Sequence, residues 1–153
     1  MVSMPSSWRA KDWRTGKAFN RRTFEELKPG FFPVFPLNWC KRHGVDPVLA
    51  ESVMNYTPMG KRTEVVLDGF APGRYLPRVQ SKSIMEDRQF DEVLASHDMN
   101  LDYLRASQPR EFLADRRQRF LDIVEYALGK PVIRDVDEAN LFGGEEGPQA
   151  FDR

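Results

Sequence analysis

Few side chains in this chain are of the types that carry acid–base or nucleophilic chemistry. The 153 residues include one cysteine, Cys40, and two histidines, His43 and His97. Cys40 and His43 are about one helical turn apart, so the imidazole could activate the thiol. The same spacing fits helix packing equally well, and we favour packing for Cys40. We expect His43 to cap or solvate the end of a helix, and His97 to be a hydrogen-bonded linker residue rather than a base.

Charge is divided unevenly along the chain, although the formal net charge is zero. Residues 1–82 carry 14 Lys and Arg against 7 Asp and Glu, whereas residues 83–153 carry 9 against 16. A positive half is typical of a surface that meets a polyanion, and a negative half could bind a basic protein partner. The alternative is two solvated surfaces that attract each other within the fold or between copies.

Length and composition favour one folded domain. Hydrophobic residues make up 41% of the chain, which is enough to expect folding rather than disorder. No apolar run approaches the ~20 residues that span a bilayer, and the first residues lack the apolar core of a secretory signal. One cysteine excludes an internal disulfide and a multi-cysteine zinc cluster. We therefore expect a cytoplasmic protein without membrane association.

Residues 1–19 show no helical or strand periodicity but carry Trp8 and Trp13 among basic residues. Aromatic side chains interleaved with basic ones can stack on bases and bind phosphates. A tryptophan in an irregular segment is more often an anchor in the core, and we favour the anchor for this arm.

Turn residues and apolar periodicity divide the first half into short elements. The expected order is a helix over residues 20–27, a strand over residues 31–35, helices opened by Pro36 and by Pro47, a strand over residues 54–59 and a turn over residues 60–62. Gly30 permits the positive φ at which the first helix can end. Residues 63–67 are ambiguous, because their Val-Val-Leu run favours a strand by propensity.

The second half is predicted to be helical, with a helix opened by Pro72 ahead of it. Residues 83–96 place four apolar side chains on one face, namely Ile84, Phe90, Val93 and Leu94. Residues 109–128 form the clearest helix, which Pro109 opens and Gly129 ends. Its predicted apolar stripe is Phe112, Leu113, Phe120, Val124 and Leu128. Arginines at positions 116, 117 and 119 alternate with acidic residues, which predicts a solvated face.

Five short motifs follow one another in the first half: residues 32–36 (FPVFP), Trp39-Cys40, residues 55–58 (NYTP), Thr63-Glu64 and residues 71–76 (APGRYL). Their order resembles the ββα-metal core of HNH endonucleases, in the form found near the C-terminus of GmrSD-like, modification-dependent restriction proteins. The resemblance covers about residues 8–133, including residues 12–16 (DWRTG) and residues 109–117 (PREFLADRR).

This resemblance implies the fold class and the organisation of the chain. We expect an α+β fold that is mostly helical, with a small ββα-type core and a C-terminal helical extension. Residues 63–67 would then be the helix that closes the core. The chain would comprise a degenerate HNH-like domain with a basic arm over residues 1–133, followed by a flexible acidic tail over residues 134–153.

The resemblance also implies where catalysis would occur. In the family, two adjacent histidines supply a metal ligand and the general base, an Asn orients the base, and a Thr-Asn position adds a ligand for Mg²⁺. The histidine positions are Phe32 and Pro33 in this chain, and neither side chain can bind a metal or accept a proton. Asn55 keeps the orienting position, and Glu64 replaces the last Asn. We therefore predict no confident catalytic residue, no metal site and no cofactor.

Three functions stay open at this point. The first is a pseudo-nuclease that binds DNA or a nuclease partner in a restriction or phage-defence setting. Its candidate DNA contacts are Arg21, Arg22, Lys41, Arg42, Lys61, Arg62, Arg74 and Arg78, for which ordinary solubility is the alternative explanation. The second is an active Mg²⁺-dependent nuclease with a rearranged site around Asn55, Glu64 and His43. The third is a protein-interaction module whose acidic half binds a basic partner.

Overall fold

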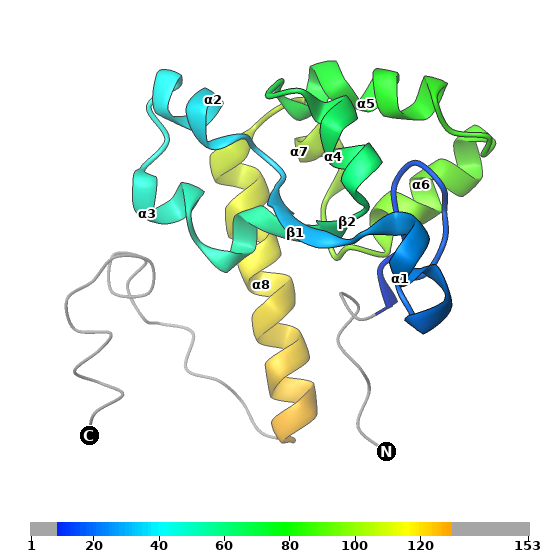
Figure 1. Ribbon diagram of the computed structural model, residues 1–153. Helices are drawn as coiled ribbons and strands as arrows, with labels where there is room; N and C mark the ends of the chain where they lie inside the picture. The colour runs from blue at the N-terminus through cyan, green and yellow to red at the C-terminus, as the bar shows by residue number, and fades with distance from the viewer. Residues whose placement is uncertain (1–8, 130–153) are drawn as a thin grey trace.

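The computed structural model describes residues 9–129. Trp8 and the predicted acidic tail over residues 134–153 therefore lie outside the described residues. Within the described part, a two-stranded antiparallel sheet lies among eight α-helices (Figure 1). This arrangement confirms the predicted α+β, mostly helical fold class. None of the helices between residues 9 and 129 is both long enough and apolar enough to span a bilayer.

Most elements are short, and they follow the predicted order closely. In chain order they are α1 (Arg21–Leu27), β1 (Gly30–Pro33), α2 (Leu37–Arg42), α3 (Pro47–Ala50), the 3-10 helix η2 (Val53–Asn55), β2 (Tyr56–Met59), α4 (Lys61–Leu67), α5 (Pro72–Ser81), α6 (Asp87–Ala95), α7 (Leu101–Arg105) and α8 (Pro109–Leu128). Proline opens α3, α5 and α8 at their first positions, where its missing N–H costs nothing.

The centre of the fold is the unit formed by β1, β2 and α4. The strands pair antiparallel, with Phe32 opposite Thr57 and Pro33 opposite Tyr56. Gly60 leads directly from β2 into α4. Residues 63–67 are thus helical, as the resemblance implied, while the turn predicted over residues 60–62 is wrong because two of these residues already form the first turn of α4.

The N-terminal arm and α5 are fixed to this centre by aromatic residues. Trp13 is fully buried and packs against Tyr75 of α5, with 5.9 Å between the ring centroids. Tyr75 in turn donates a hydrogen bond of 2.8 Å to the carbonyl of Val34, just after β1. Trp13 is therefore an anchor in the core, as the sequence favoured.

Two predicted details of the short elements are wrong. The residue with positive φ after α1 is Lys28, at 47°, whereas Gly30 begins β1. The helix predicted over residues 83–96 begins only at Asp87. Ile84 precedes α6 and is 97% exposed, so it does not share the buried face of Phe90, Val93 and Leu94.

Helix α8 covers the predicted residues and ends at Gly129, which has a φ of 69°. Its first half is packed into the fold through the buried side chains of Phe112 and Leu113. In its second half Val124 and Leu128 are exposed, and Figure 1 shows this half extending away from the body. The predicted apolar stripe is therefore buried only along the first turns of the helix.

Candidate functional site

Phe32 and Pro33, which the resemblance matches to the two histidines of the family, lie on the wall of a hollow beside α4. We call it the apolar hollow. Its volume is about 390 Å³. Its lining residues are Phe32, Pro33, Pro36, Leu37, Asn38, Glu64, Leu67 and Gly69. The β1–β2 pair and α4 thus bring together the positions that the motif order singled out. They hold a phenyl ring, a pyrrolidine ring and one carboxylate.

Glu64 is the ionisable side chain among the residues that line the apolar hollow. Its carboxylate pairs with the ammonium of Lys61 at 3.1 Å, and that ammonium lies 5.6 Å from the centroid of the Phe32 ring. One carboxylate that already has a lysine partner is a poor site for Mg²⁺, which needs several oxygen ligands. Across residues 9–129, no three His, Cys, Asp or Glu side chains are grouped so that they could hold a metal ion.

Asn55 is fully buried and does not line the apolar hollow. Its side-chain oxygen accepts a hydrogen bond from the backbone N–H of Phe35 at 2.9 Å. Its side-chain nitrogen donates to the carbonyls of Phe35 and Ala50, at 2.9 and 2.8 Å. Because both ends of the amide are occupied, Asn55 holds the segment after β1 against the residues before β2. The amide has no free group with which to orient a base.

His43 lies at the exposed end of α2, as a cap of that helix. Its Nδ1 is 2.9 Å from the carbonyl of Trp39, and its ring stacks on the Trp39 ring with 4.1 Å between centroids. It does not line the apolar hollow. The structure therefore places Glu64 in the same hollow as Phe32 and Pro33, but it places neither His43 nor Asn55 there.

Cys40 is buried on the inner face of α2. Its Sγ lies 3.6 Å from the carbonyl of Phe35, and burial raises the pKa of the thiol to about 11. A thiol with such a pKa is protonated at neutral pH and is a weak nucleophile. These observations agree with the packing role that the sequence favoured.

Arg116 is the clearest error of the sequence prediction, because it is buried rather than solvated. Its Nη1 donates to the carbonyls of Met54 and Tyr56, at 2.8 and 2.7 Å. Its Nη2 donates to the carbonyl of His97 at 3.0 Å and to Thr57 Oγ1 at 3.3 Å. Arg116 therefore ties α8 to β2. Its spacing from the apolar pair at positions 112 and 113 places it on the buried face, and that spacing was the available signal.

His97 connects this cluster to the N-terminal arm. Its Nε2 is 2.7 Å from the carbonyl of Lys11, so Nε2 carries the proton, because a carbonyl can only accept. Nδ1 then accepts from Thr57 Oγ1 at 2.5 Å. Burial, with a smaller contribution from the charge of Arg116, lowers the pKa of His97 to about 4. His97 is therefore a neutral, fully bonded linker residue at physiological pH.

A second hollow lies between the N-terminal arm, the end of α1 and the start of α4, and we call it the polar hollow. Its volume is about 510 Å³. Its lining residues are Asp12, Arg14, Glu25, Glu26, Leu27, Lys28, Gly60, Lys61, Arg62 and Thr63. Three segments that are far apart in the sequence thus form one wall. The motif order did not point to this site.

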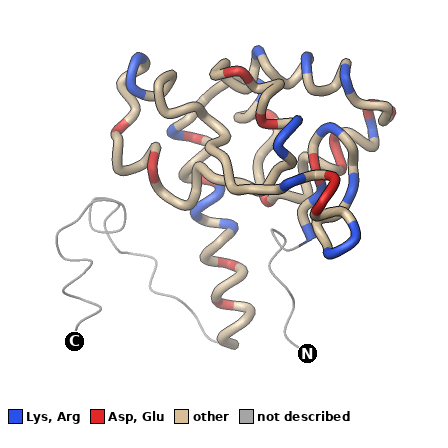
Figure 2. The backbone as a smooth tube through the Cα atoms, in the orientation of Figure 1, with Lys and Arg blue, Asp and Glu red and all other residues tan. Residues whose placement is uncertain are grey.

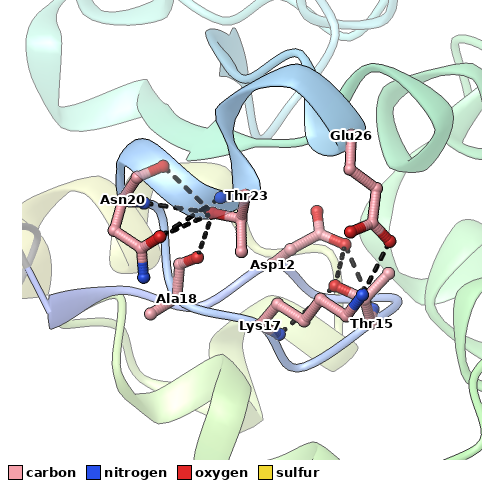
Figure 3. A network of polar contacts seen from close by, with 7 residues as sticks. All are labelled: Asp12, Thr15, Lys17, Ala18, Asn20, Thr23 and Glu26. Carbon is pink, nitrogen blue, oxygen red and sulfur yellow. Dashed lines mark hydrogen bonds and ion pairs between the residues drawn. The ribbon is translucent and has the colours of Figure 1, made fainter.

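Asp12 holds the arm against the start of α4. Its Oδ1 accepts from the backbone N–H of Gly60 and from Thr63 Oγ1, both at 2.8 Å. Its Oδ2 accepts from the backbone N–H and the hydroxyl of Thr15, at 3.1 and 3.0 Å. Figure 3 shows the bonds to Thr15 within the arm. Asp12 is fully buried, so this carboxylate is a structural tie.

The eight basic candidates lie on α1, α2, α4 and α5, and all eight are exposed. Figure 2 shows that Lys and Arg residues are spread over the whole described backbone. They do not form one cluster. Lys61 and Arg62 line the polar hollow, while Arg74 and Arg78 flank the ring of Phe70 at 4.4 and 5.2 Å. The pair on α2 lies at the opposite side of Figure 1 from the pair on α1.

The basic residues of the two halves differ in their partners. Among the eight candidates, only Lys61 pairs with a carboxylate of the described chain. In the second half, by contrast, Arg88 pairs with Glu92, Arg105 with Asp91 and Arg119 with Asp115. The N-terminal half therefore presents positive charge that the described residues leave largely unneutralised.

The chain was compared with protein-family models, with curated proteins and with solved structures, and no match was found. The relationship to HNH endonucleases therefore stays a prediction from the order of the motifs. The geometry adds an antiparallel strand pair and a following helix that meet around one hollow, with Phe32, Pro33 and Glu64 on its wall.

Proposed function

We propose that this protein is a catalytically inactive, HNH-like domain that binds the DNA backbone in a restriction or phage-defence setting. The observation that carries the proposal is the apolar hollow. There β1, β2 and α4 meet in the order of an HNH core, but Phe32 and Pro33 stand where the resemblance places the metal ligand and the base.

The side chains around the apolar hollow support the loss of catalysis. A general base typically contributes ~10²–10⁴-fold to the rate of such a reaction, and neither ring can accept a proton. Glu64 is paired with Lys61, and the amide of Asn55 is occupied by backbone groups. His43 lies elsewhere, so it does not replace the missing base.

The distribution of charge supports DNA as the ligand. Exposed cations without carboxylate partners attract phosphates from a distance and release counterions when they bind. Seven of the eight candidates are of this kind within the described chain. Contacts of this type position a protein on DNA without reading its sequence.

The first test is nicking of supercoiled plasmid by the purified protein with Mg²⁺ or Mn²⁺, beside the Glu64→Ala variant. We expect no nicking by either protein. Cleavage by the wild type that is lost in Glu64→Ala would overturn the proposal and establish an active nuclease with a rebuilt site.

The second test is binding of a labelled 20-base-pair duplex, followed by fluorescence anisotropy between 50 and 200 mM salt. We expect log K to fall linearly with log salt, and the slope to lose about 2 units in the double variant Arg74→Gln/Arg78→Gln. The control is Arg88→Gln on α6, an exposed residue paired with Glu92, which should leave the slope unchanged. Absence of salt-dependent binding would favour the protein-interaction module instead.

A further inference from the structure

We infer that the polar hollow is a binding site for a phosphate group. The favoured source of that group is the DNA backbone, and for this source the inference rests on the proposed function. A small phosphorylated compound offers the same chemistry. Arg14 and Lys28, which belong to the hollow, were not among the DNA contacts predicted from the sequence.

Three cations on the wall of the hollow have no partner among the described residues. Arg14, Lys28 and Arg62 form no side-chain hydrogen bond and no ion pair there. The Nε of Arg14 is buried and also without an acceptor. Guanidinium groups match the geometry of phosphate oxygens and can bind them through two parallel hydrogen bonds. The unpaired groups are therefore of the type that selects phosphate.

The carboxylates of the hollow do not neutralise these three cations. Asp12 directs both oxygens to donors of the arm and of α4. Glu26 pairs with Lys17 at 2.6 Å, as Figure 3 shows. Glu25, at the exposed end of α1, is the lining carboxylate that has no partner in the described chain. Unpaired positive charge thus exceeds unpaired negative charge at this site.

The backbone at Lys28 makes it possible to test the ammonium separately from the fold. Lys28 has a φ of 47° at the end of α1, in the left-handed region where glycine is the usual residue. A lysine at such a position retains strain that glycine would relieve, and such strain is often kept at functional sites. Replacement of Lys28 by glycine therefore removes the charge without a penalty in the backbone.

The floor of the hollow is closely packed, so its cations are held on a fixed frame. A Cβ at Gly60 would lie 3.1 Å from both Asp12 Oδ1 and the carbonyl of Leu27. The arm, α1 and α4 therefore meet without free space at this point. A ligand would enter from the open side, where Arg62 and Lys28 are exposed.

The test compares Lys28→Gly, Arg14→Gln and Arg62→Gln with the wild type and with the control Arg88→Gln. Two probes are used, the 20-base-pair duplex and inorganic phosphate titrated at constant ionic strength. We expect each hollow variant to bind DNA about fivefold more weakly and to lower the salt slope by about 1. We expect phosphate to raise the melting temperature of the wild type but not of these variants. Lys28→Gly should melt no lower than the wild type, which separates lost binding from lost folding.

The outcomes distinguish this inference from the proposed function. If the wild type binds DNA and all three variants bind it equally well, the hollow is not the site and the proposed function stands. If the wild type binds phosphate but not DNA, and Arg14→Gln loses phosphate binding, the site stands with a small compound as its ligand and the proposed function fails. If the wild type binds neither probe, both are wrong.

Discussion

The apolar hollow and the polar hollow share one helix, α4, but offer a ligand very different groups. The first turn of α4 gives Lys61, Arg62 and Thr63 to the polar hollow. The next residues on its wall, Glu64 and Leu67, belong to the apolar hollow. One short helix therefore separates a hollow whose carboxylate, Glu64, is already paired with Lys61 from a hollow with unpaired cations.

Two buried polar side chains, Asn55 and Asp12, hold the segments around these hollows together. Asn55 joins the segments beside the strands, and Asp12 joins the arm to α4. Both are fully buried and bonded to backbone groups. The strand pair and α4 are therefore held by buried polar groups that lie outside positions 32 and 33.

The largest effect is expected from Asn55→Ala, which removes the tie between the segment after β1 and the residues before β2. The change leaves the N–H and carbonyl of Phe35 and the carbonyl of Ala50 without this partner. Each unpaired buried group costs ~1–3 kcal/mol, so we expect the free energy of unfolding to fall by about 4 kcal/mol. Urea denaturation measures it. The control Asn38→Ala, at an exposed position of the apolar hollow, should change it by less than about 0.5 kcal/mol.

Acid should weaken the polar hollow through His97, whose Nε2 holds the arm at Lys11. The pKa of His97 is lowered from 6.5 to about 4 by burial, so the folded protein keeps the imidazole neutral while the unfolded chain takes up a proton. The contribution of His97 to the free energy of unfolding is therefore fully present above pH 6.5. It declines by about 3 kcal/mol as the pH falls toward 4.

Urea denaturation at several pH values between 4 and 7 tests this decline in the wild type and in His97→Gln. The glutamine amide can still donate and accept, but it does not titrate. Asp12 lies near the ring and Asp98 near its neighbour Arg116, and both carboxylates are present in the two proteins. The difference between the two curves therefore reports His97, and parallel curves would contradict the assignment.

Much of the fold could be predicted because its signals are local. Proline at the start and glycine at the end fix α8, whereas α1 begins one residue after its predicted start because Asn20 caps it with a side-chain bond to Thr23. The order of the motifs singled out Phe32, Pro33 and Glu64, and the structure places these three residues around one hollow. The bounds of α8 could be predicted because helix start and stop signals act within a few residues.

The features that the sequence did not reveal depend on distant partners. Arg116 looked solvated because its acceptors, the carbonyls of Met54 and Tyr56, lie about sixty positions earlier in the chain. The polar hollow unites residues 12–14, residues 25–28 and residues 60–63. No local pattern marks such a site, since its charges become neighbours only after the arm folds onto α4.

A smaller effect is expected from Asp12→Asn, which keeps the shape of the tie but not its four acceptor positions. The new amide group must face a donor, either Thr15 on one side or Gly60 and Thr63 on the other. We expect the free energy of unfolding to fall by about 2 kcal/mol. Urea denaturation monitored by tryptophan fluorescence, to which the buried Trp13 contributes, measures this loss. Asp68→Asn is the matched control, because Asp68 is exposed; an equal loss in both variants would contradict the structural role of Asp12.

The smallest effect should come from Glu64→Gln, which removes the same charge from the other hollow. The pair between Glu64 and Lys61 is partly exposed, with side-chain exposures of 33% and 58%, and such pairs contribute under about 0.5 kcal/mol. Loss of this carboxylate also frees Lys61 beside the polar hollow, so DNA affinity should rise by about twofold at low salt. Urea denaturation and anisotropy measure the two quantities. A marked loss of stability or of DNA binding would show that Glu64 still has a role in the apolar hollow. Glu64→Gln and Asp12→Asn should therefore differ in their effects, because Asp12 is buried and bonded to backbone groups whereas Glu64 is partly exposed beside the apolar hollow.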